Sequence, residues 1–141
     1  MLADNIIALP VLEVDEEFEI SKLPEGHYSL AYASHRIIRI FQRDALRIDF
    51  KPYERPGAML HAWYRIAGHA GGRIQASRSS RLVRDLSAVL GHRVRPDRVP
   101  VTALRGIAVV GRVALVQIDH RQQQLAKINQ YCVVAELLSR A

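Results

Sequence analysis

The chain contains a single cysteine, Cys132, among its 141 residues. One thiol cannot form a disulfide within the chain, and the apolar neighbours of Cys132 predict a buried, unreactive group rather than a nucleophile. Long apolar runs are also missing, since none approaches the ~18 residues that a membrane-spanning helix needs. The N-terminal segment carries acids where a secretory signal requires bases. We therefore expect a cytoplasmic protein.

The sequence also lacks the usual signatures of catalysis and of metal binding. It has six histidines, but no pair shows the spacing of a recognisable zinc site. The glycine-rich stretch 68–72 is not followed by the Lys-Ser/Thr pair of a phosphate-binding loop. Asp44, Asp49 and Asp119 are scattered among arginines, unlike the clustered carboxylates of a metal-dependent nuclease. We expect no enzyme activity, no catalytic residue, no metal and no cofactor.

Acids are scarce beyond the N-terminal segment. Residues 1–25 contain seven acids and one base, whereas residues 26–141 contain seven acids and nineteen bases. The two parts carry −6 and +12, which agrees with the net charge of +6. Most of the bases are arginines, and a guanidinium pairs with phosphate in bidentate fashion and stacks on bases. This asymmetry predicts a polyanion partner and an acidic arm that competes for the same surface. The alternative is a solvated Arg-rich surface with no such partner.

Alternation of apolar residues predicts five strands, over residues 27–41, 45–51, 58–66, 107–118 and 128–138. The first strand is long enough to require a bend near residues 34–36, and Gly111 marks a bulge or bend in the fourth. An amphipathic stripe predicts one helix, capped by Ser79 or Ser80 and ending at Gly91. This element order is that of the OB-fold, a five-stranded, partly open Greek-key barrel, although other small barrels share it. We predict a mainly β chain with an acidic arm over residues 1–22 and an OB-fold-like domain over residues 23–141.

In an OB-fold, the exposed face of the second and third strands, with adjoining loops, binds oligonucleotides. The polar positions of these strands here alternate bases with rings. Cations follow phosphates and rings stack on bases, so such a face predicts binding of single strands. The end of the first strand is expected to add His35, Arg39 and Phe41 to the same face. The predicted nucleic-acid-binding residues are Arg39, Phe41, Arg43, Arg47, Lys51, Tyr53, His61, Trp63, Arg65 and Arg121.

Trp63 is the sole tryptophan and lies on the polar side of its strand. It either stacks on a base or is covered by the N-terminal segment, for example by Phe18 or Ile6. Tyr64 has the opposite parity and is expected in the core. Two further groups of arginines either extend a phosphate track or form solvated surface: Arg73, Arg78, Arg81 and Arg84 around the helix, and Arg93, Arg95 and Arg98 after it.

Short motifs in the chain are similar to those of a known group of proteins. The stretch Leu23-Pro24-Glu25-Gly26-His27-Tyr28, the loop with Gly57, the stretch 104–109 and the run Tyr131-Cys132-Val133-Val134 resemble the small OB-fold single-stranded-DNA-binding proteins of phages and integrative elements. The similarity spans about residues 23–138. It implies a protein that coats single strands in replication or recombination of a mobile element. Several members carry an acidic tail at the C-terminus, whereas the acids here lie at the N-terminus.

The sequence thus predicts a non-catalytic, largely sequence-independent single-stranded-DNA-binding protein. RNA remains open as the ligand, because nothing in the sequence addresses the 2′-hydroxyl. A homo-oligomeric state and contacts with replication or recombination proteins remain open as well. The alternative function is a protein-interaction module of a mobile element, an inhibitor or adaptor whose arginine face meets an acidic protein.

Overall fold

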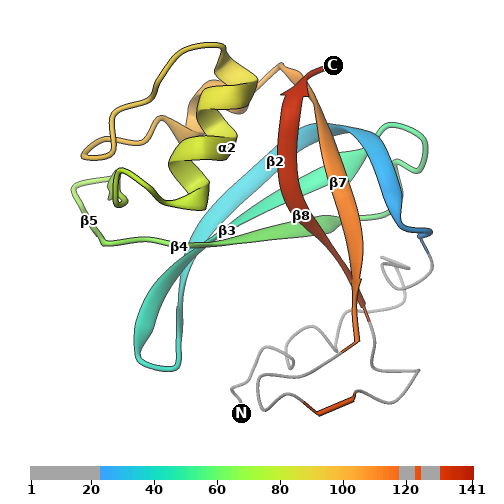
Figure 1. Ribbon diagram of the computed structural model, residues 1–141, viewed down its shortest axis with the longest axis horizontal. Helices are drawn as coiled ribbons and strands as arrows, with labels where there is room; N and C mark the ends of the chain where they lie inside the picture. Colours follow the sequence, from blue (N-terminus) through green and yellow to red (C-terminus); the bar gives the residue numbers. More distant parts are fainter. Residues whose placement is uncertain (1–22, 118–122, 125–130) are drawn as a thin grey trace.

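The computed structural model describes residues 23–117, 123–124 and 131–141. The predicted acidic arm and Arg121 lie outside these residues. The described part is mainly β (Figure 1). Its strands are β2 (Gly26–Ile40), β3 (Arg43–Pro52), β4 (Leu60–Arg65), β5 (Gly68–Ala70), β6 (Arg73–Gln75), β7 (Ala108–Val116) and β8 (Tyr131–Arg140). The α-helix α2 (Arg81–Leu90) and the 3₁₀-helix η2 (Val101–Leu104) lie between β6 and β7.

Five strands form one antiparallel sheet in the order β4-β3-β2-β7-β8. The long strand β2 is shared, because it pairs with β7 through its first residues and with β3 through the rest. A register shift between Tyr32 and Ser34 lies just before the bend predicted for residues 34–36. Within the described residues no ladder joins β4 to β8, so the sheet is not closed into a hydrogen-bonded barrel.

The irregularity predicted at Gly111 is confirmed, and its cause is a close approach between strands. The pairing of β7 with β8 shifts register between Val110 and Gly111. A Cβ atom at this position would lie 2.6 Å from Cδ1 of Leu30 and 3.2 Å from Cγ1 of Val134. Only glycine lets β2 and β8 pack this tightly around β7.

The core lies on one side of β3 and β4, against α2. Leu46, Ile48 and Phe50 of β3 are fully buried, as is Leu60 of β4. Tyr64 is only 2% exposed, which confirms its predicted place in the core. The helix adds its own buried stripe, formed by Leu82, Val83, Leu86 and Val89. The predicted alternation in β3 and β4 is therefore correct, and their polar positions face away from the core.

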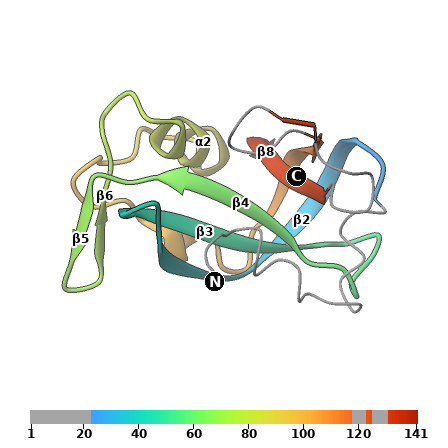
Figure 2. The ribbon, with the colours of Figure 1, turned by 90° about the horizontal axis from the view of Figure 1, so that it is seen from below.

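The helix begins and ends as the sequence predicts. The Ser80 side chain accepts a hydrogen bond from the backbone N–H of Val83, at 3.2 Å, and Gly91 follows the last residue in a left-handed conformation. Viewed at right angles to Figure 1, α2 lies alongside β4, and the β5–β6 hairpin extends from the far end of that strand (Figure 2). This hairpin occupies the region that we predicted as a loop at residues 68–72. No helix in the described part of the chain is long and apolar enough to cross a bilayer.

Two polar side chains of α2 bridge the seam between β4 and β8. The Arg81 guanidinium donates to the carbonyl of Ala135 in β8, at 2.7 Å, and to the carbonyl of Trp63 in β4. It also lies over the Tyr64 ring, 4.5 Å from its centroid. Arg81 was predicted to lie on a phosphate track or in solvent; instead it joins two strand edges whose buried carbonyls need donors.

Asp85, one helical turn further on, bridges the same two strands. Its Oδ2 atom accepts hydrogen bonds from the Tyr64 hydroxyl of β4, at 2.7 Å, and from the Leu137 N–H of β8, at 3.2 Å. Burial raises the pKa of Asp85, and these hydrogen bonds only partly oppose that effect. Side chains of α2 thus occupy the place where a direct β4–β8 ladder would close the sheet.

Candidate nucleic-acid interface

The strands β2, β3 and β4 present polar residues on the side away from the core. Their register places directly opposite residues in three neighbouring rows: Ser34, Asp49 and His61; Arg36, Arg47 and Trp63; and Ile38, Ala45 and Arg65. We call this surface, together with Arg43 and Lys51 at the two ends of β3, the sheet face. Of the residues predicted from the sequence, the sheet face brings together Arg43, Arg47, Lys51, His61, Trp63 and Arg65.

A buried carboxylate organises the first two rows. Asp49 is 5% exposed although it points away from the core, because polar side chains surround it. Arg47 donates to its two oxygens at 2.8 and 3.2 Å, and the Ser34 hydroxyl donates at 2.8 Å. His61 Nδ1 lies 2.7 Å from Oδ1. Arg47 and His61 are therefore held in fixed positions by one acid.

Asp49 stays ionised at neutral pH despite its burial. Burial alone would raise the pKa of this carboxyl, but the hydrogen bonds from His61, Arg47 and Ser34, with the charge of Arg47, outweigh burial and lower the pKa. The negative charge offsets that of Arg47. Arg47 therefore contributes less free positive charge to the sheet face than the sequence predicts.

Arg36 is the member of the sheet face that our sequence analysis missed. It lies directly opposite Arg47 and is exposed. Like charges on directly opposed strand positions destabilise a sheet. Asp49 offsets the charge of Arg47, but Arg36 has no acidic partner among the residues described. An anion from outside the domain would relieve that repulsion.

The bulge in β2 explains why Arg36 was missed. A strand that gains one unpaired residue turns its following side chains to the other face. Before the register shift, even positions such as Leu30 face the core; after it, odd positions such as Ile37 pack there. Ser34 and Arg36 are the polar residues at even positions that signalled this switch.

For the same reason, the placement of His35 and Arg39 on the sheet face is wrong. His35 lies opposite Ile48, whose side chain is in the core, and bonds to the Tyr32 hydroxyl at 2.6 Å. Arg39 lies opposite Asp44 and forms an ion pair with it at 3.2 Å. Asp44 also lies 3.3 Å from His69 of β5, so Arg39 belongs to the β5 side of the sheet.

Two exposed rings lie at the ends of the sheet face rather than on it. Phe41 and Gln42 form the tight turn between β2 and β3, both with positive φ, of 51° and 65°. The Phe41 side chain is 60% exposed at this tip, where the hairpin extends away from α2 (Figure 1). Tyr53, 56% exposed, follows β3 at the opposite end. Arg121, predicted to join the site from a loop, lies outside the described residues.

Trp63 lies where the sheet face meets the helix. Its indole is partly exposed and contacts the His61 ring edge to face, with centroids 6.4 Å apart. Trp63 and Arg65 line a pocket of about 420 Å³ together with residues at the start of α2, among them Ser77 and Ser80. A flat ring and a cation therefore border one hollow at the edge of the sheet face.

The described residues contain no group of three or more His, Cys, Asp or Glu side chains that could hold a metal ion. The residues of the sheet face that could contact a ligand are mainly arginines, Lys51 and the rings of His61 and Trp63. The comparisons with known proteins found no match to a family model, to a curated protein or to a solved structure.

Proposed function

We propose that residues 23–141 form an OB-type domain in which β2, β3, β4, β7 and β8 take the places of strands one to five. Three features support this proposal: a long first strand shared between two partners, a helix between the third and fourth strands, and side-by-side packing of the third strand with the fifth. Arg81 and Asp85 would complete the barrel across the β4–β8 seam. OB-folds bind oligonucleotides on strands two and three, which correspond to β3 and β4.

We propose that the sheet face binds single-stranded DNA without catalysis, during replication or recombination of a mobile element. The observation that carries the proposal is the row formed by Arg36, Arg47 and Trp63, in which two opposed guanidinium groups lie beside the sole indole. Phosphates would relieve the repulsion between the two cations, while the indole would stack on a base. Each stacked base contributes roughly 1–3 kcal/mol in proteins of this kind.

The exposed turn at Phe41 supports the same function. A non-glycine residue in the left-handed region costs about 1–2 kcal/mol, so a Phe-Gln turn is a poor choice for stability alone. The Phe41 side chain of this turn is 60% exposed at one end of the sheet face. Tyr53 offers a second ring at the other end, so a bound strand could stack at both ends of the face.

A salt titration with oligo-dT tests the proposal. The wild-type affinity should fall steeply with salt, with a slope of roughly −0.7 per phosphate contact. The double variant Arg36→Gln/Arg65→Gln should lower that slope by about 1.4. Arg105→Gln/Arg140→Gln removes two exposed charges elsewhere and is the matched control.

Three results would contradict the proposal: no binding of oligo-dT at micromolar protein, a flat salt dependence, or equal effects of the two double variants. An acidic protein that stays bound to the chain after nuclease treatment, and is released by Arg36→Gln/Arg65→Gln, would instead favour a protein-interaction module.

A further inference from the structure

A second basic surface is built by β6 and the segment that follows α2. The Val99 N–H donates to the carbonyl of Ile74 at 2.9 Å, and the Ala76 N–H donates to the carbonyl of Pro96 at 2.8 Å. These two bonds fix β6 against residues 96–99. Four arginines lie within two residues of these bonded positions, and a fifth, Arg93, follows the end of α2. The five are Arg73, Arg78, Arg93, Arg95 and Arg98. We call them the loop surface.

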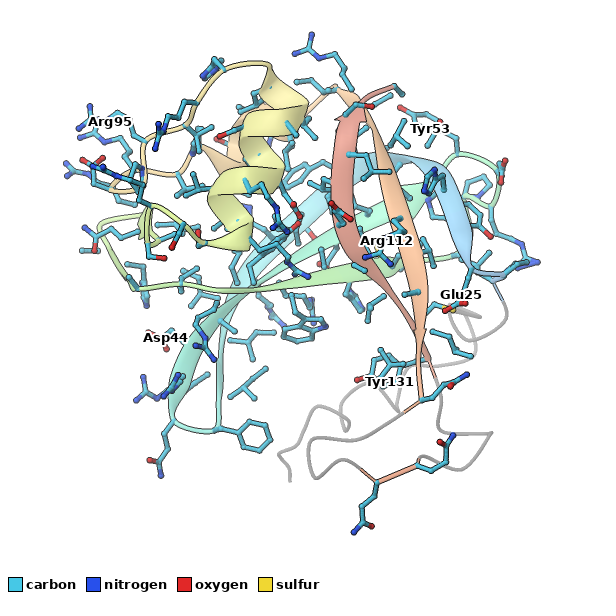
Figure 3. The ribbon with its side chains drawn as sticks, in the orientation of Figure 1. Glu25, Asp44, Tyr53, Arg95, Arg112 and Tyr131 are labelled. Carbon is cyan, nitrogen blue, oxygen red and sulfur yellow. The ribbon has the colours of Figure 1, made fainter. Side chains whose placement is uncertain are left out.

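The loop surface lies apart from the far end of the sheet face. Arg95 and Tyr53 point outward at opposite ends of the longest axis of the molecule (Figure 3). The two surfaces approach each other near the end of β4, where the Ala67 N–H donates to the carbonyl of Gln75 at 2.7 Å. A ligand on the row of Trp63 would therefore leave most of the loop surface uncovered.

Positive charge on the loop surface is poorly compensated. All five arginines are exposed. The acid beside them is Asp97, which accepts from Arg95 at 3.1 and 2.7 Å. The hydrogen bond from Arg95 lowers the pKa of Asp97, and the nearby charge of Arg98 contributes to the same effect. Five bases and this one acid leave a charge of +4, and Arg73, Arg78, Arg93 and Arg98 make no ion pair with any residue that the structure describes.

The loop surface has no Phe, Tyr or Trp side chain, unlike the sheet face. Residues 65–130 contain no Phe, Trp or Tyr at all. The apolar residues of these loops, Ile74, Val94 and Val99, are buried. Protein interfaces gain most of their binding energy from aromatic and apolar anchors in a desolvated centre, and this surface offers none. Its chemistry therefore fits a charged backbone better than an acidic protein.

We propose that the loop surface is a separate site for the phosphate backbone of nucleic acid, which binds without regard to base sequence or to strandedness. Guanidinium groups form bidentate pairs with phosphate, and neutralised phosphates release counterions. Without a Phe, Tyr or Trp ring for stacking, this surface has little that would favour an unpaired base. One molecule can then hold a single strand on the sheet face while the loop surface contacts a duplex segment.

Two triple variants of the full chain test this division. Arg73→Gln/Arg93→Gln/Arg98→Gln alters the loop surface, and Arg36→Gln/Lys51→Gln/Arg65→Gln removes the same charge from the sheet face. All six side chains are exposed, so both proteins should melt within a few degrees of the wild type. Affinity for a short duplex and for oligo-dT of the same length is measured against salt, with Trp63 fluorescence as a separate report on the sheet face.

The loop variant should bind the duplex roughly tenfold more weakly at low salt, with a salt slope reduced by about 2.7, and should keep the Trp63 response to oligo-dT. The sheet-face variant should keep most duplex binding. Equal loss of duplex binding in both variants, or no loss in the loop variant, would overturn the proposal. Competition by polyglutamate as strong as that by polyphosphate of equal charge would also overturn it, in favour of an acidic protein. If Trp63 never responds to oligo-dT while the loop result holds, the proposed function of the sheet face fails and this inference stands.

Discussion

The sheet face and the loop surface are both rich in arginine, but they differ in what surrounds the cations. On the sheet face, a buried carboxylate fixes Arg47 and His61 beside an indole. On the loop surface, the acid Asp97 is exposed, and four of the five arginines make no ion pair with any described residue. A fixed cation next to a large ring can recognise the shape of a nucleotide, whereas exposed cations without such a ring respond to charge density. The same residue type thus serves two kinds of recognition, and the neighbours decide which one.

Asp85 bridges the seam between β4 of the sheet face and β8. We therefore expect the largest effect from Asp85→Ala. This change leaves the Tyr64 hydroxyl and the Leu137 N–H without their acceptor, in a site where Asp85 is 1% exposed. We expect a loss of about 3 kcal/mol in the free energy of unfolding, measured by urea denaturation. Arg78→Gln is the control, since this exposed arginine makes no ion pair with any described residue and its loss should cost less than about 0.5 kcal/mol. An Asp85→Ala protein as stable as the control would show that the seam does not depend on this carboxylate.

The next largest effect should separate the two surfaces. Trp63→Ala removes the ring in the central row of the sheet face and should weaken oligo-dT binding by roughly 1–3 kcal/mol, or about tenfold for each 1.4 kcal/mol. Duplex binding should not change, because Trp63 is not part of the loop surface. Trp63→Phe keeps a ring and should retain most of the affinity. Equal weakening of both ligands by Trp63→Ala, measured by fluorescence anisotropy, would erase the distinction between the surfaces.

Asp49 gives the sheet face a pH dependence that the loop surface lacks. Its pKa is lower in the folded chain than in the unfolded chain, so the ionised carboxylate stabilises the fold. This contribution is complete above the ordinary pKa of 3.8 and is lost as the pH falls below it. Asp49→Asn should cost roughly 1.5 kcal/mol at neutral pH and should flatten the acid limb of a plot of stability against pH. An unchanged acid limb would show that Asp49 is not held as described.

Asp97→Asn is the comparison for that experiment. Asp97 is fully exposed, although the hydrogen bond from Arg95 also lowers its pKa. Exposed ion pairs contribute little because solvent and salt screen them. The acid limb should therefore stay as in the wild type. This contrast tests whether the buried acid, rather than any acid beside an arginine, organises its surface.

Among the changes expected to alter the protein, the smallest effect should come from the turn at Phe41. Replacing Phe41-Gln42 by Asn-Gly supplies the residues that this turn type prefers and should raise stability by about 1 kcal/mol in thermal or urea unfolding. The same change removes an exposed ring, so oligo-dT binding should weaken. Gln42→Gly alone keeps the ring and should give a smaller gain in stability with no loss of binding. A double variant that gains stability and binds equally well would exclude Phe41 from the site.

Local sequence rules were sufficient for much of the fold. Alternation in β3 and β4 correctly predicted which residues face the core, and Ser80 and Gly91 marked the ends of α2. These features depend on neighbours along the chain. Gly111 was also recognised, because a lone glycine within a strand usually marks a bulge or a close approach.

The parts that sequence reasoning missed depend on contacts between distant segments. One extra residue near Tyr32 reversed the orientation of Arg36 and Arg39, and nothing local fixes the position of a bulge. The role of Arg81 depends on carbonyls of β4 and β8, which are far away in the sequence. The sequence showed Asp49 only as an acid among arginines, because its position as the centre of a network depends on the register of three strands.

The central claim is that the indole on the sheet face is open to an unpaired base. Because Trp63 is the sole tryptophan, its emission reports on this position alone. Titration with oligo-dT should quench that emission with saturation, and the midpoint should move to higher DNA concentration as salt is added. Emission that stays constant while anisotropy shows DNA bound would place the strand elsewhere and contradict the account.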